Sequence, residues 1–369
     1  MLHFRRGLTT AANSLPSIAE VRSALMQHVS AFDHSVSYDP NRSHPVSNSR
    51  TACTIPLGSN PKTQLRYKNA SGYNRARFGV LLEDLDTFAV WCAFRHNQEP
   101  GVPMGTPAHH PMLIVTACVD RIEMQNKTVR SDLDILMSGH VSWVGRSSLE
   151  ATMTLTQRYG DDDVRDLLTA RFVMVSQDPN TGKSTQNTPL KLESSEDIAT
   201  FERGEIAKNS RIARERNSLL RTVPTEEERN VLHEMFLKTI NEKKHSFARI
   251  LPAGHVWMPN AKLKNSIICF PEDQNLYGKI FGGYLMRVAF ETAWANAAAF
   301  SHCRPHIVEV DNIMFRKSVE VGSLLLLNSQ FLRLCTATSI PTMFPYNRQS
   351  ASPISSFTRL RSVVGARLA

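Results

Sequence analysis

The chain has 369 residues, of which 21% are charged, and a net charge of +9. This length accommodates two domains of ordinary size, and no run of about 18 apolar residues predicts a membrane-spanning helix. Residues 1–30 carry a net charge of +2 and residues 329–369 one of +5, which leaves the body near +2, so no nucleic-acid partner is expected.

The first residues, MLHFRRGLTTAANSLPS, contain Arg5 and Arg6, and no acidic residue precedes Glu20. This composition is typical of a mitochondrial presequence, since a secretory signal needs a longer apolar run. We therefore predict a presequence over residues 1–30 and a mitochondrial location, in the matrix or on the inner-membrane side. The alternative is a basic terminus without a targeting role. Residues 31–60 are rich in Ser, Asn and Pro and predict an irregular lead.

A first helix followed by strands is predicted within residues 61–190. The helix starts near Phe78 and has one apolar stripe, made by Leu81, Leu82, Leu85, Phe88, Ala89 and Cys92. The strand-like segments MLIVTACV and GHVSWVG follow, and then apolar residues alternate with polar ones from Leu149 to Thr156. Alternation with a period of two indicates antiparallel strands that are buried on one face, so this region predicts an α+β unit.

Residues 191–250 carry the densest charge in the chain. Capping residues, acidic first turns and basic ends predict two helices. Val223 and Pro224 separate them, and Thr225 caps the second helix. Their polarity favours a surface connector, and we assign no chemistry to it.

A second helix-and-strand unit is predicted over residues 251–330. Its centre is the segment NLYGKIFGGYLMRVAFETAWANAAAF, residues 275–300, in which Gly278, Gly282 and Gly283 precede a helix that is apolar almost all round. Such a helix is expected to be buried. A buried helix N-terminus with accessible amides is suited to bind an electron-rich oxygen. The segments IVEVDNIMF and VEVGSLLLLNSQ then predict strands.

The two helices are copies of each other, in either of two registers one residue apart. One register aligns Phe78 with Phe281 and Gly79 with Gly282, whereas the other aligns Gly79 with Gly283. Helix followed by strands, repeated, predicts two related α+β units in one chain.

The tail, residues 331–369, contains no acidic residue and no lysine, and it includes Pro341, Pro345 and Pro353. Proline removes a donor from a β-ladder, and the alternation in this tail is short. We expect a divergent basic tail that is poorly ordered, an incomplete second unit, and an unpaired sheet edge.

The six cysteines, at positions 53, 92, 118, 269, 303 and 335, include no CxxC pair. Cys92 and Cys118 lie in apolar elements, which favours reduced core thiols over disulfides or a zinc site. No metal site and no cofactor are predicted.

These features resemble the two-hotdog mitochondrial acyl-CoA thioesterases, of the acyl-coenzyme A thioesterase 9 type. The resemblance covers roughly residues 55–330 and rests on LLEDLDTFAV, on HVSWVGRSSLE from His140 to Glu150, on FVMV before DPNTGK, and on NLYGKIFGGYLMR. It implies an α+β tandem hotdog fold, in which an antiparallel sheet wraps a central helix in each repeat. It also implies hydrolysis of fatty acyl-CoA to free acid and coenzyme A without a metal or redox cofactor, and a homo-oligomer formed through the sheets. A hydratase hotdog is disfavoured because its paired Asp and His loop is absent.

The resemblance implies a composite site, in which an Asn from one unit's loop faces a carboxylate on the other unit's helix. Here these are Asn275 and Asp86, with the amide of Gly282 or Gly283 as a further donor. Their mirror counterparts, Ser71 and Phe290, lack the required groups, so one site is expected. The alternatives are a solvated charge for Asp86 and a turn residue for Asn275.

Donors such as these would stabilise the oxyanion formed when a thioester carbonyl is attacked, and Asp86 would act as general base or as nucleophile. Arg146, Arg316 and Lys317 stand at strand ends near glycines and are candidates for binding coenzyme A phosphates, with solvated surface charge as the alternative. A second hypothesis is a non-catalytic acyl-CoA-binding or assembly subunit, inactivated by the altered C-terminus.

Overall fold

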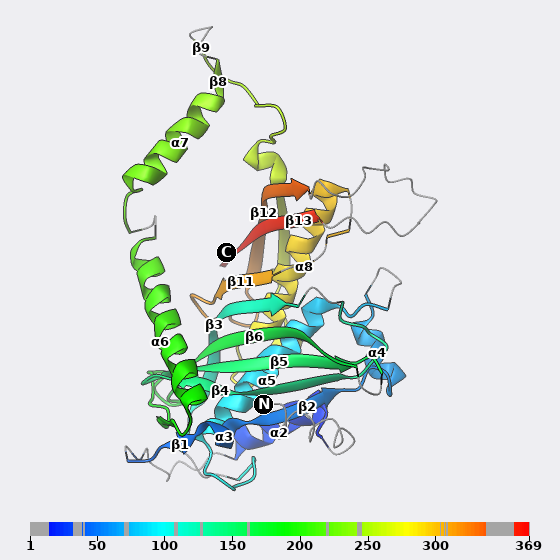
Figure 1. Cartoon of the computed structure of the whole chain (residues 1–369), viewed down its shortest axis with the longest axis vertical. Coiled ribbons are helices and arrows are strands. Elements are labelled where there is room, and N and C mark those ends of the chain that lie inside the picture. Colours follow the sequence, from blue (N-terminus) through cyan, green and yellow to red (C-terminus); the bar gives the residue numbers. More distant parts are fainter. Residues whose placement is uncertain are drawn as a thin grey trace.

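A computed structural model provides the structure of the chain (Figure 1). It describes residues 15–31, 39, 41–69, 74–106, 110–125, 128–160, 163–218, 221–241, 246–302, 304–305, 307, 309–336 and 358–368. In this part of the chain, no helix is both long enough and apolar enough to cross a bilayer.

The first unit wraps an antiparallel sheet around helix α5 (Phe78–Asn97). The five strands of this unit are β2 (Thr51–Ile55), β3 (Leu113–Met124), β4 (Ile135–Val144), β5 (Ser148–Arg158) and β6 (Val164–Gln177). Their order in the sheet is β3-β6-β5-β4-β2, so the strand that precedes the helix and the strand that follows it form opposite edges of the unit. This arrangement is the hotdog fold that the sequence predicted.

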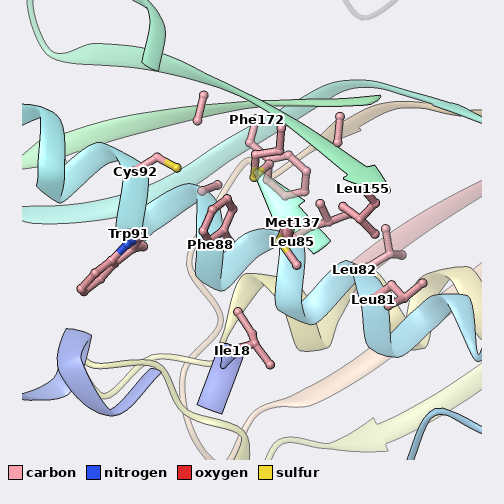
Figure 2. Close-up of a cluster of buried hydrophobic side chains, with 14 of the residues drawn as sticks. Ile18, Leu81, Leu82, Leu85, Phe88, Trp91, Cys92, Met137, Leu155 and Phe172 are labelled. Atoms are coloured by element: carbon pink, nitrogen blue, oxygen red, sulfur yellow. The ribbon is translucent and has the colours of Figure 1, made fainter. Parts of the chain in front are cut away.

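The core of the first unit lies between α5 and the sheet. Leu81, Leu82, Leu85 and Phe88 are fully buried, and Figure 2 shows this face of α5 packed towards Phe172 and other side chains of the strands. Truncating one such side chain to alanine typically costs about 2 to 5 kcal/mol. The predicted apolar stripe is therefore the main contact that fixes α5 in the sheet.

The second unit repeats the pattern around α8 (Gly282–Ser301). Its strands are β10 (Lys262–Ile268), β11 (Glu309–Met314), β12 (Leu324–Thr336) and β13 (Thr358–Leu368). The strands β10, β12 and β13 form one sheet, whereas β11 pairs with β3 of the first unit. The first sheet therefore has six strands and extends across both units.

The structure settles the register of the repeat. Helices α5 and α8 both have 20 residues, and Phe78 and Gly282 are their first residues. The contacts between the helices are reciprocal in the same register, because Gly283 lies against Glu83 and Gly79 lies against Arg287. Gly79 therefore corresponds to Gly283, and the alternative alignment with Gly282 is wrong.

The tail differs from the expectation at one point. Strand β12 runs on to Thr336, and β13, within the tail, pairs with it along its whole length from Thr358 to Leu368. The prediction that residues 331–369 could not supply a strand was therefore wrong. The three prolines that argued against a strand all lie in residues 337–357, outside the described residues, and β13 itself contains none.

The second unit remains more open than the first. In the first unit β6 lies between β5 and β3, but among the described residues no strand fills the equivalent place between β13 and β11. Consistently, nearly every residue of α5 is buried, whereas six of the 20 residues of α8 are buried. The expectation that α8 would be buried all round was too strong, because the described strands of the second sheet leave one side of the helix uncovered.

The first unit begins earlier than predicted. Strand β2 lies inside residues 31–60, which we expected to be irregular, and it pairs with β4. Before it, helix α2 (Ile18–Ser30) buries Ile18, Val21 and Leu25 against the same core. A boundary at residue 61 is therefore too late. The predicted presequence, residues 1–30, overlaps α2, and its residues 1–14 lie outside the described residues.

The connector contains the two expected helices, α6 (Ser195–Arg216) and α7 (Glu226–Lys238), and Thr225 caps the second one. Helix α6 lies on the outer face of the first sheet, where Gly204 packs directly against Trp143. The remaining short elements are α3 (Val46–Ser49), α4 (Pro61–Tyr67), β1 (His44–Pro45), β7 (Leu190–Lys191), β8 (Ile240–Asn241), β9 (Ser246–Arg249) and two 3-10 turns, η3 (Met258–Ala261) and η4 (Pro271–Asp273).

Candidate active site

Asp86 lies on α5 and is 1% exposed. The hydroxyl of Thr116, on β3, donates to Asp86 Oδ1 over 2.5 Å. The backbone N–H of Gly283, in the first turn of α8, also donates to this carboxylate. A carboxylate of the first unit is thus held at the N-terminus of the central helix of the second unit, and it is not a solvated charge.

This position suits both partners electrostatically. The first residues of a helix present N–H groups without intrahelical acceptors and a partial positive charge, and a carboxylate satisfies both. Phe281, the N-cap residue of α8, makes no side-chain capping bond of its own. Asp86, which belongs to the first unit, therefore caps α8 of the second unit, as the side chain of a Ser or Asp N-cap residue usually does.

Burial controls the protonation of Asp86. Loss of solvent raises its pKa to about 6, while the hydrogen bonds from Thr116 and Gly283 act in the opposite direction. A carboxylate with this pKa is mostly ionised at neutral pH and accepts a proton more readily than a solvated one. These are the properties of a general base.

Gly282 keeps space open beside the carboxylate. A Cβ atom at this position would lie 3.0 Å from Asp86 Oδ2 and 3.7 Å from the ring of Phe315. Only glycine leaves the space beside the Asp86 carboxylate open. The N–H of Gly282, at the first position of α8, has no intrahelical acceptor. Gly282 and Gly283 are therefore both at the site, but the Gly283 amide already serves Asp86, so Gly282 is the freer donor.

Asn275 lies in the loop that leads into α8 and is half-buried. Its side-chain Oδ1 accepts from the backbone N–H of Tyr277 at 2.9 Å and of Lys279 at 3.1 Å. These bonds use the oxygen of the carboxamide and leave its Nδ2 group without an acceptor among the described residues. The turn role and the donor role of Asn275 are thus compatible, because they use different atoms.

The loop of Asn275 is attached to the first unit. The hydroxyl of Tyr277 accepts from the backbone N–H of Ile114 at 3.1 Å, and Leu276 packs against the first core. Ile114 precedes Thr116 by two residues on β3, which corresponds to about 7 Å along a strand. Strand β3 therefore holds both the loop of Asn275 and, through Thr116, the carboxylate of Asp86.

The mirror position has no such chemistry. In the register of the structure, Phe290 corresponds to Asp86 and Phe78 corresponds to Gly282, and their rings pack edge to face with centroids 5.1 Å apart. The neighbouring Glu291 is paired with Arg77, with Arg77 Nε 2.7 Å from Glu291 Oε1. Ser71 lies outside the described residues. Two aromatic rings thus occupy the place of a carboxylate and a glycine.

A buried ionic cluster supports the helix pair next to the site. Glu83 contacts Arg287 of α8 at 2.7 Å and Arg66 of α4 at 2.6 Å. Asp84 accepts from the hydroxyl of Tyr67 at 2.6 Å, and burial raises its pKa to about 6 as well. Glu83 and Asp84 pair with other side chains than Asp86 does. They therefore position the helices and do not belong to the site.

The three cations predicted to bind coenzyme A phosphates lie in two places. Arg316 and Lys317 are exposed and directly follow Phe315, whose ring borders the site. Arg146 is exposed in the β4–β5 turn, and the carbonyl of the neighbouring Ser147 accepts from the backbone N–H of Ser176 on β6. Since β6 lies between β5 and β3, this turn is two strands across the sheet from β3, or about 10 Å at the usual strand spacing. Arg316 and Lys317 thus adjoin a residue that borders the site, whereas Arg146 is separated from β3 by β6.

Three residues around the site were missed in the sequence: Thr116, which bonds Asp86, Tyr277, which bonds Ile114, and Phe315, which lies beside Gly282. Thr116 had a signal, since it is the one hydroxyl in the apolar segment MLIVTACV. Tyr277 and Phe315 gave none, because their contacts join elements that are distant in the sequence. Both depend on how the two units meet.

The chain is similar to curated acyl-CoA thioesterases. It is 48% identical over 278 residues to acyl-coenzyme A thioesterase 9, mitochondrial, of Bos taurus, and 44% identical over 277 residues to acyl-coenzyme A thioesterase 10, mitochondrial, of Mus musculus. Each match covers 75% of this chain and 62% of the relative, so the chain spans about three fifths of the length of these proteins. No family model matches the chain.

A solved structure, an apo-hexameric acyl-CoA thioesterase, has 20% sequence identity and a TM-score of 0.37, over 48% of this chain and 99% of that one. The chain thus resembles the two-hotdog mitochondrial acyl-CoA thioesterases in sequence.

Proposed function

We propose that this chain, as its resemblance to the mitochondrial acyl-CoA thioesterases suggests, hydrolyses fatty acyl-CoA to a free fatty acid and coenzyme A. The observation that carries the proposal is the position of Asp86, a buried carboxylate of one unit held at the glycine N-terminus of the other unit's helix. We further propose that the reaction takes place in mitochondria and that the chain forms homo-oligomers.

In the reaction, the oxygen of a water molecule attacks the thioester carbonyl carbon while Asp86 accepts a proton from that water. The carbonyl π electrons move to the oxygen, and the Nδ2 group of Asn275 and the amide of Gly282 stabilise the resulting oxyanion. Loss of one such donor typically costs about 3 to 4 kcal/mol. The tetrahedral intermediate then breaks the C–S bond, and protonated Asp86 returns its proton to the leaving thiolate.

A variant of this route begins with direct attack of Asp86 on the carbonyl carbon and gives a mixed anhydride that water hydrolyses. Single turnover in ¹⁸O-labelled water distinguishes the two routes. Attack by water places the label only in the fatty acid, whereas attack by Asp86 places it in the enzyme instead when water cleaves the anhydride at the Asp86 carbonyl.

Coenzyme A is the leaving group of the substrate, and Arg316 and Lys317 would pair with its phosphates; both are exposed and follow Phe315, which borders the site. No metal ion or redox cofactor has a part in this proposal. Arg146 is not included, because β6 separates its turn from β3, the strand that carries Thr116.

The test is hydrolysis of a long-chain acyl-CoA by the full chain. Asn275→Ala and Asp86→Ala should each lower turnover more than tenfold without loss of the fold, and Asn180→Ala, in an exposed hairpin turn, is the control. Turnover like that of the wild type in either site variant would remove the composite site.

The lack of a strand between β13 and β11 among the described residues favours a second candidate function, a non-catalytic acyl-CoA-binding or assembly subunit. This candidate predicts that acyl-CoA binds saturably while the wild-type chain shows no turnover.

A further inference from the structure

A cavity of about 290 Å³ lies on the outer face of the first sheet, on the side away from α5. Its floor is made by β4, β5 and β6, and its roof by the first turns of α6, which lies along this face (Figure 1). The volume is at the lower end of the roughly 300 to 1,000 Å³ usual for small-molecule sites. It suits a small ligand, or one group of a larger ligand.

The floor of the cavity is polar because of strand alternation. Along β4, Met137 and Val141 face the core, so Ser138 and His140 face outwards. His140 pairs across the sheet with Thr152, and Ser138 pairs with Thr154, which in turn pairs with Thr169 on β6. These pairings bring a row of hydroxyl groups and one imidazole together under α6.

Helix α6 is fixed above this floor by contacts beyond the cavity. A Cβ atom at Gly204 would lie 2.5 Å from Trp143, so the backbone of α6 rests on this side chain. The Trp143 Nε1 group donates to Glu205 Oε1 at 2.8 Å. Arg203 and Thr200 are thereby held over the cavity by packing, and they line it.

Three nitrogen-bearing side chains in the cavity wall have no hydrogen bond or ion pair with the described part of the chain. Arg50, His140 and Arg203 all line the cavity, and among the described residues none of their side chains makes a hydrogen bond or an ion pair. Burial lowers the pKa of His140 to about 4, so its imidazole is neutral and offers one N–H donor. Two guanidinium groups provide fixed positive charge and several donors.

Two acidic residues, Glu196 and Asp197, also line the cavity, in the first turn of α6. Glu196 is exposed, whereas Asp197 is half-buried and accepts from the backbone N–H of Ser194 as part of the helix cap. Both lie at the positive end of the helix, which offsets part of their negative charge. The sheet side of the cavity, in contrast, carries no carboxylate.

We propose that this cavity is a binding site for a phosphate-class oxyanion, separate from the site of Asp86, with Arg50 and Arg203 as its charged ligands and His140 and the threonine hydroxyls as donors. Guanidinium groups bind such oxygens through paired, charge-assisted hydrogen bonds. The site also gives a role to His140, the first residue of the segment HVSWVGRSSLE, which the proposed reaction does not use.

The test is calorimetric titration of the full chain with inorganic pyrophosphate, against sodium chloride of the same ionic strength. We expect saturable binding that weakens at least tenfold in Arg203→Gln and in Arg50→Gln. Arg216→Gln, an exposed arginine near the end of the same helix, is the matched control and should bind as the wild type does.

The double variant Arg316→Gln, Lys317→Gln separates this site from the proposed coenzyme A site, and it too should bind pyrophosphate as the wild type does. Absence of saturable heat with the wild type would overturn the proposal. Equal weakening in Arg216→Gln, or loss of binding in the double variant with retention in Arg203→Gln, would also overturn it.

Discussion

Phe78 and Phe290 pack edge to face, 5.1 Å between ring centroids, at the place where the repeat would otherwise have a second glycine and a second carboxylate. Their counterparts are Gly282 and Asp86, which are in contact on the other side of the helix pair. The same backbone arrangement therefore supports a polar site on one side and an apolar contact on the other. This asymmetry supports the prediction of one site per chain.

The aromatic pair leads to a prediction about Phe290→Asp. In an Asp86→Ala background this change should not restore turnover, because Phe78 has no counterpart of the open space at Gly282 and position 71 is a serine. It should also destabilise the chain, since a carboxylate would replace a ring packed on Phe78. Acyl-CoA hydrolysis and thermal unfolding measure both effects, and restored turnover would show that the mirror site is intact.

The stability of Asp86→Asn should depend on pH. The pKa of Asp86 is raised in the folded state, from 3.8 to about 6, so its contribution to stability is complete below pH 3.8 and is lost as the pH rises through about 6. At pH 7 the neutral asparagine should therefore stabilise the fold, by up to about 3 kcal/mol at 1.36 kcal/mol per pKa unit. Urea unfolding at pH 7 and at pH 4 tests this, and a variant less stable than wild type at pH 7 would contradict it.

The N-terminal segment gives a prediction in two parts. Residues 1–30 should carry a reporter into mitochondria, and replacing Arg5 and Arg6 by Glu should leave it in the cytosol. However, deleting residues 1–14 should preserve thermal stability, whereas deleting residues 1–31 should lower it markedly, since α2 buries Ile18, Val21 and Leu25. Mitochondrial import of the reporter with both Glu substitutions would show that the targeting signal does not depend on Arg5 and Arg6.

Processing is constrained by the same contacts. The backbone N–H of Thr54 donates to the carbonyl of Pro16 at 2.9 Å, so β2 holds the chain just before α2. If the presequence is cleaved after import, the new N-terminus should precede Pro16. Sequencing of the N-terminus from isolated mitochondria would show this, and a mature chain that begins after residue 30 would contradict it.

Hydrogen exchange should divide the chain into two halves. Strands β5 and β6 have neighbours on both sides, whereas β13 has a neighbour on one side only among the described strands. We expect slow exchange in β5 and β6, and faster exchange in β13 and in α8, whose burial is incomplete. Equal protection in both units would mean that an element outside the described residues closes the second sheet.

Sequence patterns predicted the local elements well. The stripe from Leu81 to Cys92 gave α5, the alternation after Leu149 gave β5, and the cap at Thr225 gave the start of α7. Each of these signals depends on neighbours within one element, which is why it can be read without the fold.

The pairing of distant elements was harder to predict. The register of the repeat was open by one residue because several apolar positions match in both alignments, and only the contact of Gly283 with Glu83 decides it. Strand β13 was missed because the prolines at positions 341, 345 and 353 were taken as evidence against a strand anywhere in the tail, although residues 358–368 contain no proline. Asp86 was found through the family resemblance, whereas Thr116 and Phe315 required the packing of two units.

The pH dependence of kcat/KM for hydrolysis of a long-chain acyl-CoA tests the composite site most directly, with Asp86→Asn and Asp84→Asn as a matched pair. Both carboxylates are buried on α5 with a pKa of about 6, but only Asp86 touches the start of α8. We expect wild type and Asp84→Asn to gain activity as the pH rises through about 6, and Asp86→Asn to lose more than tenfold in rate together with this rise. An unchanged profile in Asp86→Asn would contradict the proposal that Asp86 is the base.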